Sequence, residues 1–279
     1  MSRQAEARAR FAACVGRPEQ DIDLAEAALL IAAEEYPDLD VAAYLALLAR
    51  MGEEARRRTA GAQSPGSALQ ALNRYLFDEL GFAGNAEDYY DPRNSYLNEV
   101  LERRTGIPIT LSTVYMAVAR HGGLPIRGVG FPGHFLVKLE GEGEEIVLDP
   151  FNRGAILTET DCRKLLHRET EGRAVFSRDL LEATGTKAIL ARMLGNLKGI
   201  YSATRQYAKA LSCVERILLL APDASREIRD RGLLLAQVQR TEEAIQALLR
   251  YLKQTPAPED AEKVREQVRA LRMQQALLN

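Results

Sequence analysis

The chain has 279 residues, 46% hydrophobic and 27% charged, which is enough apolar side chain for two domains with cores of their own. Its net charge of -2 gives no electrostatic reason for binding nucleic acid or an anionic membrane surface. The N-terminus mixes acids and bases and no 18 apolar residues run together, so we expect neither an export signal nor a membrane span.

The first third of the chain predicts helices. Apolar residues at three- and four-residue steps from Glu19 to Arg58 predict two amphipathic helices, separated at Tyr36-Pro37-Asp38. Ser67 is placed to cap a third helix, and a short helix is expected after Ser95. The helix expected over Thr110–His121 alternates small and large apolar residues, which predicts that it is the most buried of these helices.

Two strand-like runs, 134–140 and 143–149, are separated only by Gly141-Glu142. A glycine that opens a two-residue loop suits a type II′ turn, and such a turn fixes the register of the hairpin. The resulting register places His134 opposite Asp149 and Lys138 opposite Glu145, with apolar residues facing apolar residues between these two pairs.

A further strand is expected over residues 124–131, and Thr158 is placed to open a helix after the hairpin. These elements predict a small, mostly antiparallel sheet packed on helices. The predicted class is therefore α+β for this part of the chain.

From Lys187 onward strand signals stop, and apolar and small residues recur 34 residues apart, as at Ala210 and Ala244. A helix-turn-helix unit of this length is typical of tetratricopeptide repeats. We expect two degenerate repeats and a last helix over 259–278, in an all-α region. Stacked helix pairs leave a groove that suits a peptide or another protein, so a protein or peptide partner is predicted there.

The pair His134 and Asp149 is the main candidate for chemistry. A carboxylate beside an imidazole orients the ring and favours its protonated form, which is the base-and-orienter half of a nucleophilic triad. The structural alternative is an ordinary cross-strand contact worth about 0.2 to 1 kcal/mol. The three histidines and three cysteines have no close spacing, so we predict neither a metal site nor a cofactor, and the odd, scattered cysteines favour reduced thiols in the cytoplasm.

Several short motifs, in order, resemble the transglutaminase-like core of the papain-related cysteine hydrolases: Gly106-Ile107-Pro108, the run from Arg120 to Arg127, His134-Phe135 and Asp149-Pro150. With Asp91-Pro92 and Asn94-Ser95-Tyr96-Leu97 upstream and the helical repeats downstream, the whole chain most resembles the bacterial SirB-type family. This resemblance implies a transglutaminase-like domain with a helical N-terminal extension over residues 1–184 and tetratricopeptide-like repeats over 185–279.

The resemblance also implies where a nucleophile belongs. In enzymes of the wider superfamily a cysteine opens the helix that here ends near Arg120, and counting back along that helix leads to Pro108. Proline has no nucleophilic atom. Ser112, one turn further along, and Cys162, in the first turn of the helix after Thr158, are the remaining candidates, and each has a structural alternative as a buried packing residue.

Other residues are expected to line a cleft beside His134, namely Pro108, Tyr90, Asp91 and Gly133. Our first hypothesis is a noncatalytic protein that binds a partner through its repeats. The second is an amide hydrolase or acyl transferase in which Ser112 or Cys162 attacks and His134 acts as the base. The third is an adaptor whose repeats do everything and whose N-terminal half is a docking platform.

Overall fold

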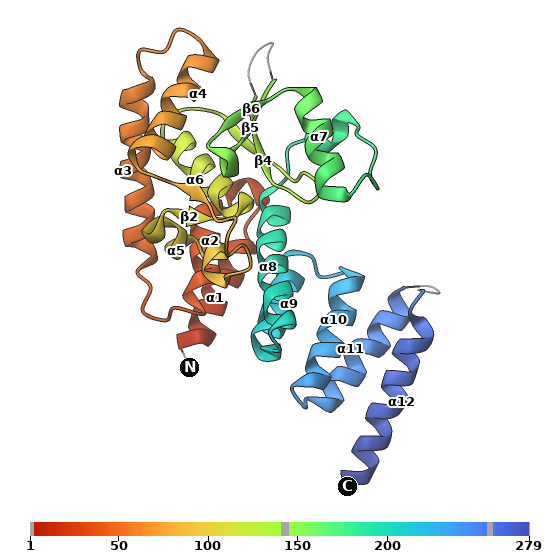
Figure 1. Cartoon of the computed structure of the whole chain (residues 1–279). Helices are drawn as coiled ribbons and strands as arrows, with labels where there is room; N and C mark the ends of the chain where they lie inside the picture. Colours follow the sequence, from red (N-terminus) through yellow and green to blue (C-terminus); the bar gives the residue numbers. More distant parts are fainter. Residues whose placement is uncertain (1–2, 141–144, 256–258, 279) are drawn as a thin grey trace. The chain divides into compact units, whose positions relative to one another are not determined.

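A computed structural model describes residues 3–140, 145–255 and 259–278, and the chain divides into two compact units. The first unit is Met1–Met193 and the second unit is Leu194–Asn279. Figure 1 shows that the first unit combines helices with a small sheet, whereas the second is built from helices. The predicted α+β class is confirmed.

The helices before the sheet follow the predicted pattern with two changes. They are α1 (Arg3–Val15), α2 (Leu24–Ala33), α3 (Val41–Thr59), α4 (Pro65–Asn73), α5 (Leu97–Arg103) and α6 (Pro108–His121), with short helical turns at Glu19–Asp21, Arg74–Glu79 and Pro92–Ser95. The break at Tyr36-Pro37-Asp38 is confirmed, whereas α1 has no counterpart in the prediction. The cap of α4 is Ser64 and not Ser67, because the two serines form a reciprocal capping box with Ser67 at the third helical position.

Helix α6 is almost completely enclosed, since every residue from Pro108 to Ala119 is buried. It begins two residues earlier than predicted, with Pro108 in its first turn, where the missing N–H costs no hydrogen bond. At its far end, an added Cβ on Gly52 of α3 would lie 2.1 Å from Cβ of His121, so this glycine permits the close approach of α3 and α6.

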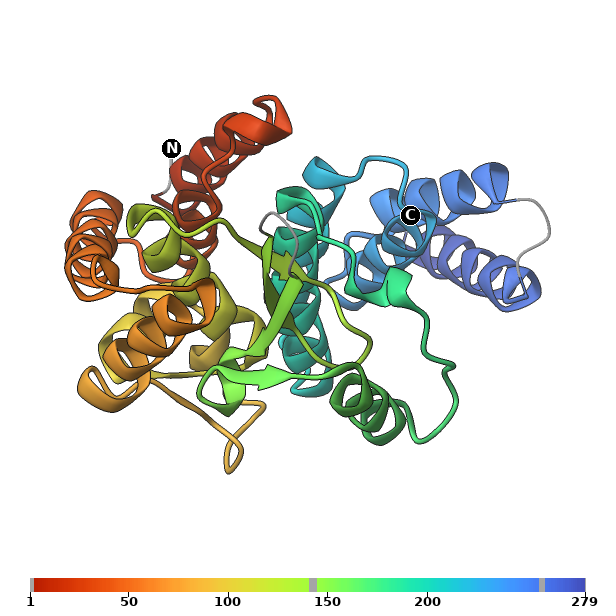
Figure 2. The same cartoon turned by 90° about the horizontal axis from the view of Figure 1, so that it is seen from above.

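Four antiparallel strands form the main sheet in the order β3 (Ile126–Val129), β4 (Leu136–Glu140), β5 (Glu145–Asp149) and β6 (Ala155–Leu157). Two further strands of two residues each, β1 (Ala83–Gly84) and β2 (Thr105–Gly106), pair in parallel. Figure 2 shows the main sheet at the centre of the first unit, with the helices α3 to α6 on one side of it. Helix α6 packs directly against β3 and β4.

The register of the hairpin differs from the prediction by two residues, because Val137 pairs with Leu148 and Glu140 pairs with Glu145. The turn predicted at Gly141-Glu142 lies outside the described residues. The observed register places Lys138 opposite Val147 and Glu140 opposite Glu145, so the cross-strand matching of charged and apolar residues that favoured the predicted register does not decide it. A shift of two residues leaves every side chain on its predicted face, since strand side chains alternate with a period of two.

The other face of the sheet packs against helix α7 (Glu159–Thr170), whose predicted cap at Thr158 is confirmed. The cluster between them comprises buried residues from the sheet, from α7 and from the turn at Arg178–Leu181, namely Val129, Phe131, Leu136, Val147, Cys162, Leu165, Leu166 and Leu181.

The second unit is helical throughout its described residues, as predicted. Helix α8 (Thr186–Ala203) begins before it, and α9 (Tyr207–Leu220), α10 (Ser225–Gln237), α11 (Thr241–Gln254) and α12 (Ala261–Leu278) follow. The starts of α9 and α11 keep the predicted 34-residue spacing, and α10 packs against both of them. Among the described helices of the whole chain, none has the combination of length and apolar composition that crossing a membrane requires.

Candidate functional site

His134 and Asp149 form a buried pair at one end of the β4–β5 hairpin. Nε2 of His134 lies 2.9 Å from Oδ1 of Asp149, and the two side chains are only 6% and 3% exposed. The contact is diagonal in the observed register, because Asp149 ends β5 whereas His134 precedes β4 by two residues. The predicted contact between His134 and Asp149 is therefore correct, although the register from which it was derived is wrong.

The Asp149 carboxylate is held by more than the imidazole. Its Oδ1 also accepts from the backbone N–H groups of Phe151 and Asn152, at 3.0 and 3.3 Å, and its Oδ2 accepts from Nδ2 of Asn152 at 2.6 Å. Burial by itself raises the pKa of Asp149, but the hydrogen bonds from His134 and Asn152 and the charge of His134 outweigh it, so the pKa lies below its usual value. Asp149 is therefore an ionised orienter of the ring.

The backbone before His134 is a tight turn. The His134 N–H donates to the carbonyl oxygen of Phe131 at 3.2 Å, and Gly133 has a φ of +74°, which glycine adopts without strain. A Cβ added to Gly133 would also lie 2.6 Å from Cβ of Glu169. The imidazole then meets the edge of the Phe151 ring, with centroids 5.9 Å apart. Asp149 binds Nε2, which leaves Nδ1 as the nitrogen through which the ring would exchange a proton.

In the described part of the chain, no hydrogen bond connects the nucleophile candidates Ser112 and Cys162 to this pair. Pro108 is buried as the first residue of α6, and Ser112 on the same helix is fully buried. The Ser112 hydroxyl has no hydrogen-bond partner among the described residues. Cys162 is fully buried in α7, and burial together with the charges of Asp161, Glu159 and Asp149 raises the pKa of its thiol to about 11. The thiol is therefore protonated at neutral pH and a poor nucleophile.

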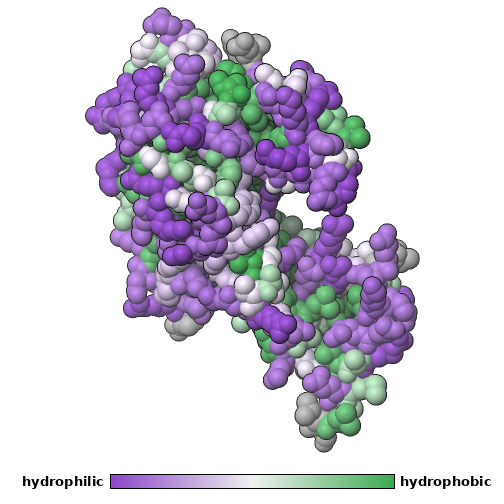
Figure 3. All heavy atoms as spheres, viewed as in Figure 1, coloured by the Kyte–Doolittle hydropathy of each residue, from purple (hydrophilic) through white to green (hydrophobic). Residues whose placement is uncertain are grey.

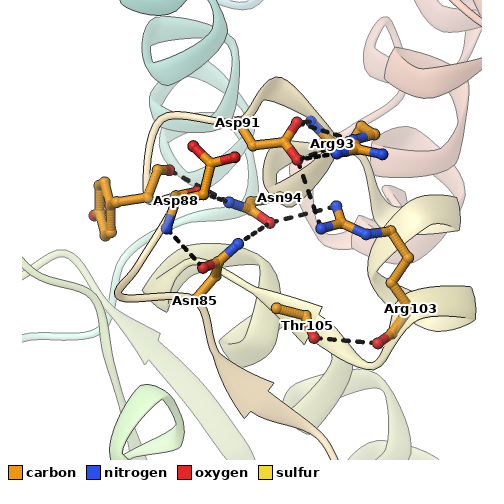
Figure 4. A network of polar contacts seen from close by, with 8 residues as sticks. Asn85, Asp88, Asp91, Arg93, Asn94, Arg103 and Thr105 are labelled. Atoms are coloured by element: carbon orange, nitrogen blue, oxygen red, sulfur yellow. Dashed lines mark hydrogen bonds and ion pairs between the residues drawn. The ribbon is translucent and has the colours of Figure 1, made fainter.

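Tyr90 and Asp91 belong to a loop that a polar network holds in place (Figure 4). The buried side chain of Asn94 donates to the Asp88 carbonyl oxygen at 2.7 Å, and its Oδ1 accepts from Asn85 at 3.2 Å. Asp91 is committed to ion pairs with Arg93 and Arg103, at 2.8 and 3.5 Å, while Tyr90 is 76% exposed. Asp91 thus supports the loop, and Tyr90 faces solvent.

Sequence reasoning missed Arg192, which binds the backbone of the turn before His134. Its Nη1 donates to the Phe131 carbonyl oxygen at 2.9 Å, and its Nη2 donates to the carbonyl oxygen of His134 at 2.5 Å. No local pattern signals a residue that reaches the turn from helix α8, 58 residues later in the chain. Asn152, by contrast, was accessible to sequence reasoning, since Asp-Pro-x-Asn is typical of a side-chain-capped turn.

A cavity of about 570 Å³ lies elsewhere in the first unit, lined by α6, the start of α2 and the segment before α8, and none of the predicted site residues lines it. In the part of the chain that the structure describes, no group of three or more His, Cys, Asp or Glu residues is arranged to hold a metal ion.

The model of the transglutaminase-like superfamily matches residues 42–195, which is more than half of the chain and includes the His134–Asp149 pair. The chain belongs to the transglutaminase-like superfamily. A tetratricopeptide-repeat model matches residues 197–269 of this transglutaminase-like protein, in agreement with its helical second unit.

The transglutaminase-like protein has relatives over most of its length. It is 40% identical to a UPF0162 protein of Xylella fastidiosa (strain Temecula1) over 250 residues, covering 88% of this chain and 89% of the relative. It is 32% identical to a UPF0162 protein of Vibrio cholerae, covering 80% and 83%. It is 39% identical to F-box only protein 21 of Homo sapiens over 137 residues, 46% of this chain but 21% of that protein. No solved structure gives a significant match.

Proposed function

We propose that this transglutaminase-like protein is a noncatalytic, cytoplasmic member of the SirB-type family that binds a protein or peptide partner through its helical repeats. In this proposal the His134–Asp149 pair remains as scaffold. The observation that carries it is Pro108 at the first position of α6, where the superfamily resemblance leads us to expect the nucleophilic cysteine. A thiolate at that position would gain from the helix dipole and a nearby imidazole, and proline offers no such atom.

The neighbouring side chains support this reading. No hydrogen bond joins His134 to Ser112 or Cys162 among the described residues, and the raised pKa of the Cys162 thiol, about 11, disfavours attack by sulfur.

The second unit supports the binding role, since tetratricopeptide repeats commonly mediate protein interactions. Several large apolar side chains are exposed on its helices, including Leu219, Leu233 and Leu249 at 42%, 38% and 40%. Figure 3 shows hydrophobic residues at the surface among hydrophilic ones over the repeat helices at the lower right. Exposed apolar side chains of this kind suit a protein interface.

Labelling tests the noncatalytic part. The native chain is treated with an electrophilic amide probe for thiols and a fluorophosphonate for serine, beside a His134→Ala variant. We expect no rapid labelling of Cys162 or Ser112 in either chain, because neither side chain is hydrogen-bonded to a base among the residues that the structure describes. Stoichiometric labelling of one of them that His134→Ala abolishes, with the circular dichroism spectrum unchanged, would contradict the proposal.

Affinity capture tests the proposed partner binding by the repeats. The three baits are the native chain, a double variant that carries Leu233→Asp and Leu249→Asp, and a His134→Ala variant. We expect the native chain and the His134→Ala variant to capture the same partner. The double variant should not capture it, because its aspartates place charge in an apolar contact. Capture that survives the aspartates and requires the first unit instead would favour the docking-platform hypothesis.

The alternative function, a serine-dependent amide hydrolase or acyl transferase, has one observation in its favour. The Ser112 hydroxyl is buried, lacks a described partner and lies one turn from Pro108 on the same helix. Loss of a measured amidase or crosslinking activity in Ser112→Ala, His134→Ala and Asp149→Ala alike would establish it.

A further inference from the structure

Arg192 is a half-buried cation that makes no ion pair with an acid among the described residues. Both of its described hydrogen bonds go to neutral backbone carbonyl groups, those of Phe131 and His134, and its guanidinium lies 5.5 Å from the centre of the Phe135 ring. Arg163 offers a contrast in the same unit. It also lies over a phenylalanine ring, that of Phe176 at 4.6 Å, but it pairs with Glu159 at 2.7 Å.

The missing partner matters because a guanidinium carries five N–H groups and a full charge. Two of the five donate to described carbonyl groups, which leaves three N–H groups without a described protein partner. Burial lowers the pKa of Arg192, and the acidic group that acts against this effect is the Tyr89 hydroxyl, which is itself uncharged at neutral pH. A cation held in this way gains most from an arriving anion, since it is already partly desolvated and fixed in direction.

Aromatic rings lead from the molecular surface to the side chain of His134, whose carbonyl oxygen accepts from Arg192. Tyr90 is 76% exposed and meets Tyr89 at 5.4 Å between ring centroids, Tyr89 meets Phe151 at 6.3 Å, and Phe151 meets His134 at 5.9 Å. All three contacts are edge-to-face. The loop that carries both tyrosines is fixed by the Asn94 network of Figure 4, so it is a preformed surface.

We propose that Arg192, Tyr89 and Tyr90 form a binding site for an acidic peptide segment, in which Arg192 binds a side-chain carboxylate and the two tyrosine rings pack against the neighbouring residue. The site lies beside His134, whose carbonyl oxygen Arg192 holds. This inference goes beyond the proposed function, because it gives the first unit a ligand of its own, independent of the repeats.

The charges around the site favour a singly charged carboxylate over a phosphate group. Arg192 supplies one positive charge. Burial is the main cause that raises the pKa of the Tyr89 hydroxyl, and the charge of Glu169 raises it further, whereas the charge of Arg192 lowers it. Asp149 adds a second negative charge on the far side of the His134 ring. Glu169 already pairs with Arg168 at 2.9 Å and Asp149 with His134 at 2.9 Å, so these two acids leave Arg192 available, and its single charge matches one carboxylate better than a doubly charged phosphate.

Calorimetric titration of the full chain tests the site with two matched probes, N-acetyl-Tyr-Glu-amide and N-acetyl-Tyr-Gln-amide. We expect the glutamate peptide to bind native chain at least about tenfold more tightly. Arg192→Gln should bring the ratio of the two peptide affinities close to one. The control Arg163→Gln, which also removes a cation over a phenylalanine ring, should leave this ratio unchanged.

Because Arg192 also holds the turn, Tyr90→Ala provides a second variant at an exposed position. It should weaken the binding of both peptides by a similar factor, about three or more, and preserve the ratio of their affinities. Equal affinity of the two probes for native chain, an unchanged ratio in a folded Arg192→Gln chain, or inorganic phosphate competing at lower concentration than acetate would overturn the inference. Partner capture by the repeats is expected to be unaffected by Arg192→Gln, so the two proposals fail separately.

Discussion

At the scale of single residues, the Asp149 side chain accepts several hydrogen bonds within the candidate site. One carboxylate orients the His134 imidazole and caps the turn at Pro150–Asn152 through two backbone N–H groups. The contact between the imidazole and the carboxylate is therefore part of the local fold. Retention of the pair does not by itself indicate catalysis, because the same contacts stabilise the end of the hairpin.

Asp149→Asn should lower the free energy of unfolding by about 1 to 3 kcal/mol at pH 7, because an amide cannot replace the buried charge-assisted hydrogen bonds. Urea unfolding measures this change. Asp38→Asn, at a side chain that is 86% exposed, is the control and should change stability by less than about 1 kcal/mol.

The same carboxyl predicts a pH dependence. The unfolded carboxyl takes up its proton near pH 3.8, whereas the folded one stays ionised to lower pH. The unfolded state therefore binds the proton first, and the stability that Asp149 contributes is complete above about pH 4 and is lost as the pH falls through its folded pKa. Identical pH profiles for native and Asp149→Asn chains would contradict this account.

At the scale of elements, glycines set how closely helices approach. A Cβ added to Gly232 in α10 would lie 2.7 Å from the side chain of Leu248 and 3.2 Å from its backbone nitrogen in α11. The α10–α11 pair of the second repeat therefore needs a residue without a side chain at this crossing. The 34-residue pattern predicted the helices, but this contact sets the distance between them.

Gly232→Ala is expected to destabilise the chain by about 1 to 3 kcal/mol, because the backbone of α11 has to move to admit the methyl group. Gly195→Ala in α8 is the matched control, since nothing lies within 4 Å of the added Cβ. That substitution should stabilise by about 0.5 to 1 kcal/mol through helix propensity. Urea unfolding of the two variants should give shifts of opposite sign, and shifts of the same sign would show that the crossing is not tight.

At the scale of the whole molecule, two compact units divide at Met193, and the family models divide between residues 195 and 197. The boundary expected between residues 184 and 185 stays a prediction. All three cysteines are free and buried in the cores of these units, at 1% exposure or less.

Thiol reactivity should report the integrity of both units. Burial is the main cause that raises the pKa of both Cys14 and Cys162 to about 11, so few thiolates form at pH 8. We expect a disulfide reagent to react with the folded chain at least about tenfold more slowly than with the urea-unfolded chain, where three thiols titrate. Rapid reaction of one thiol in folded protein would identify a cysteine that opens locally.

The sequence by itself determined most of the helices after α1, the α+β class, the repeats and the pairing of His134 with Asp149, because each depends on local periodicity or on residues joined by one hairpin. The register predicted for the hairpin was wrong by two residues, since both registers bury the same faces. Only the tertiary structure decided that Ser112 and Cys162 are buried without a described hydrogen bond to His134 and that Arg192 binds the backbone of the turn before it. Those facts depend on residues distant in the chain, whose approach is set by the packing of whole helices against the sheet and leaves no local pattern.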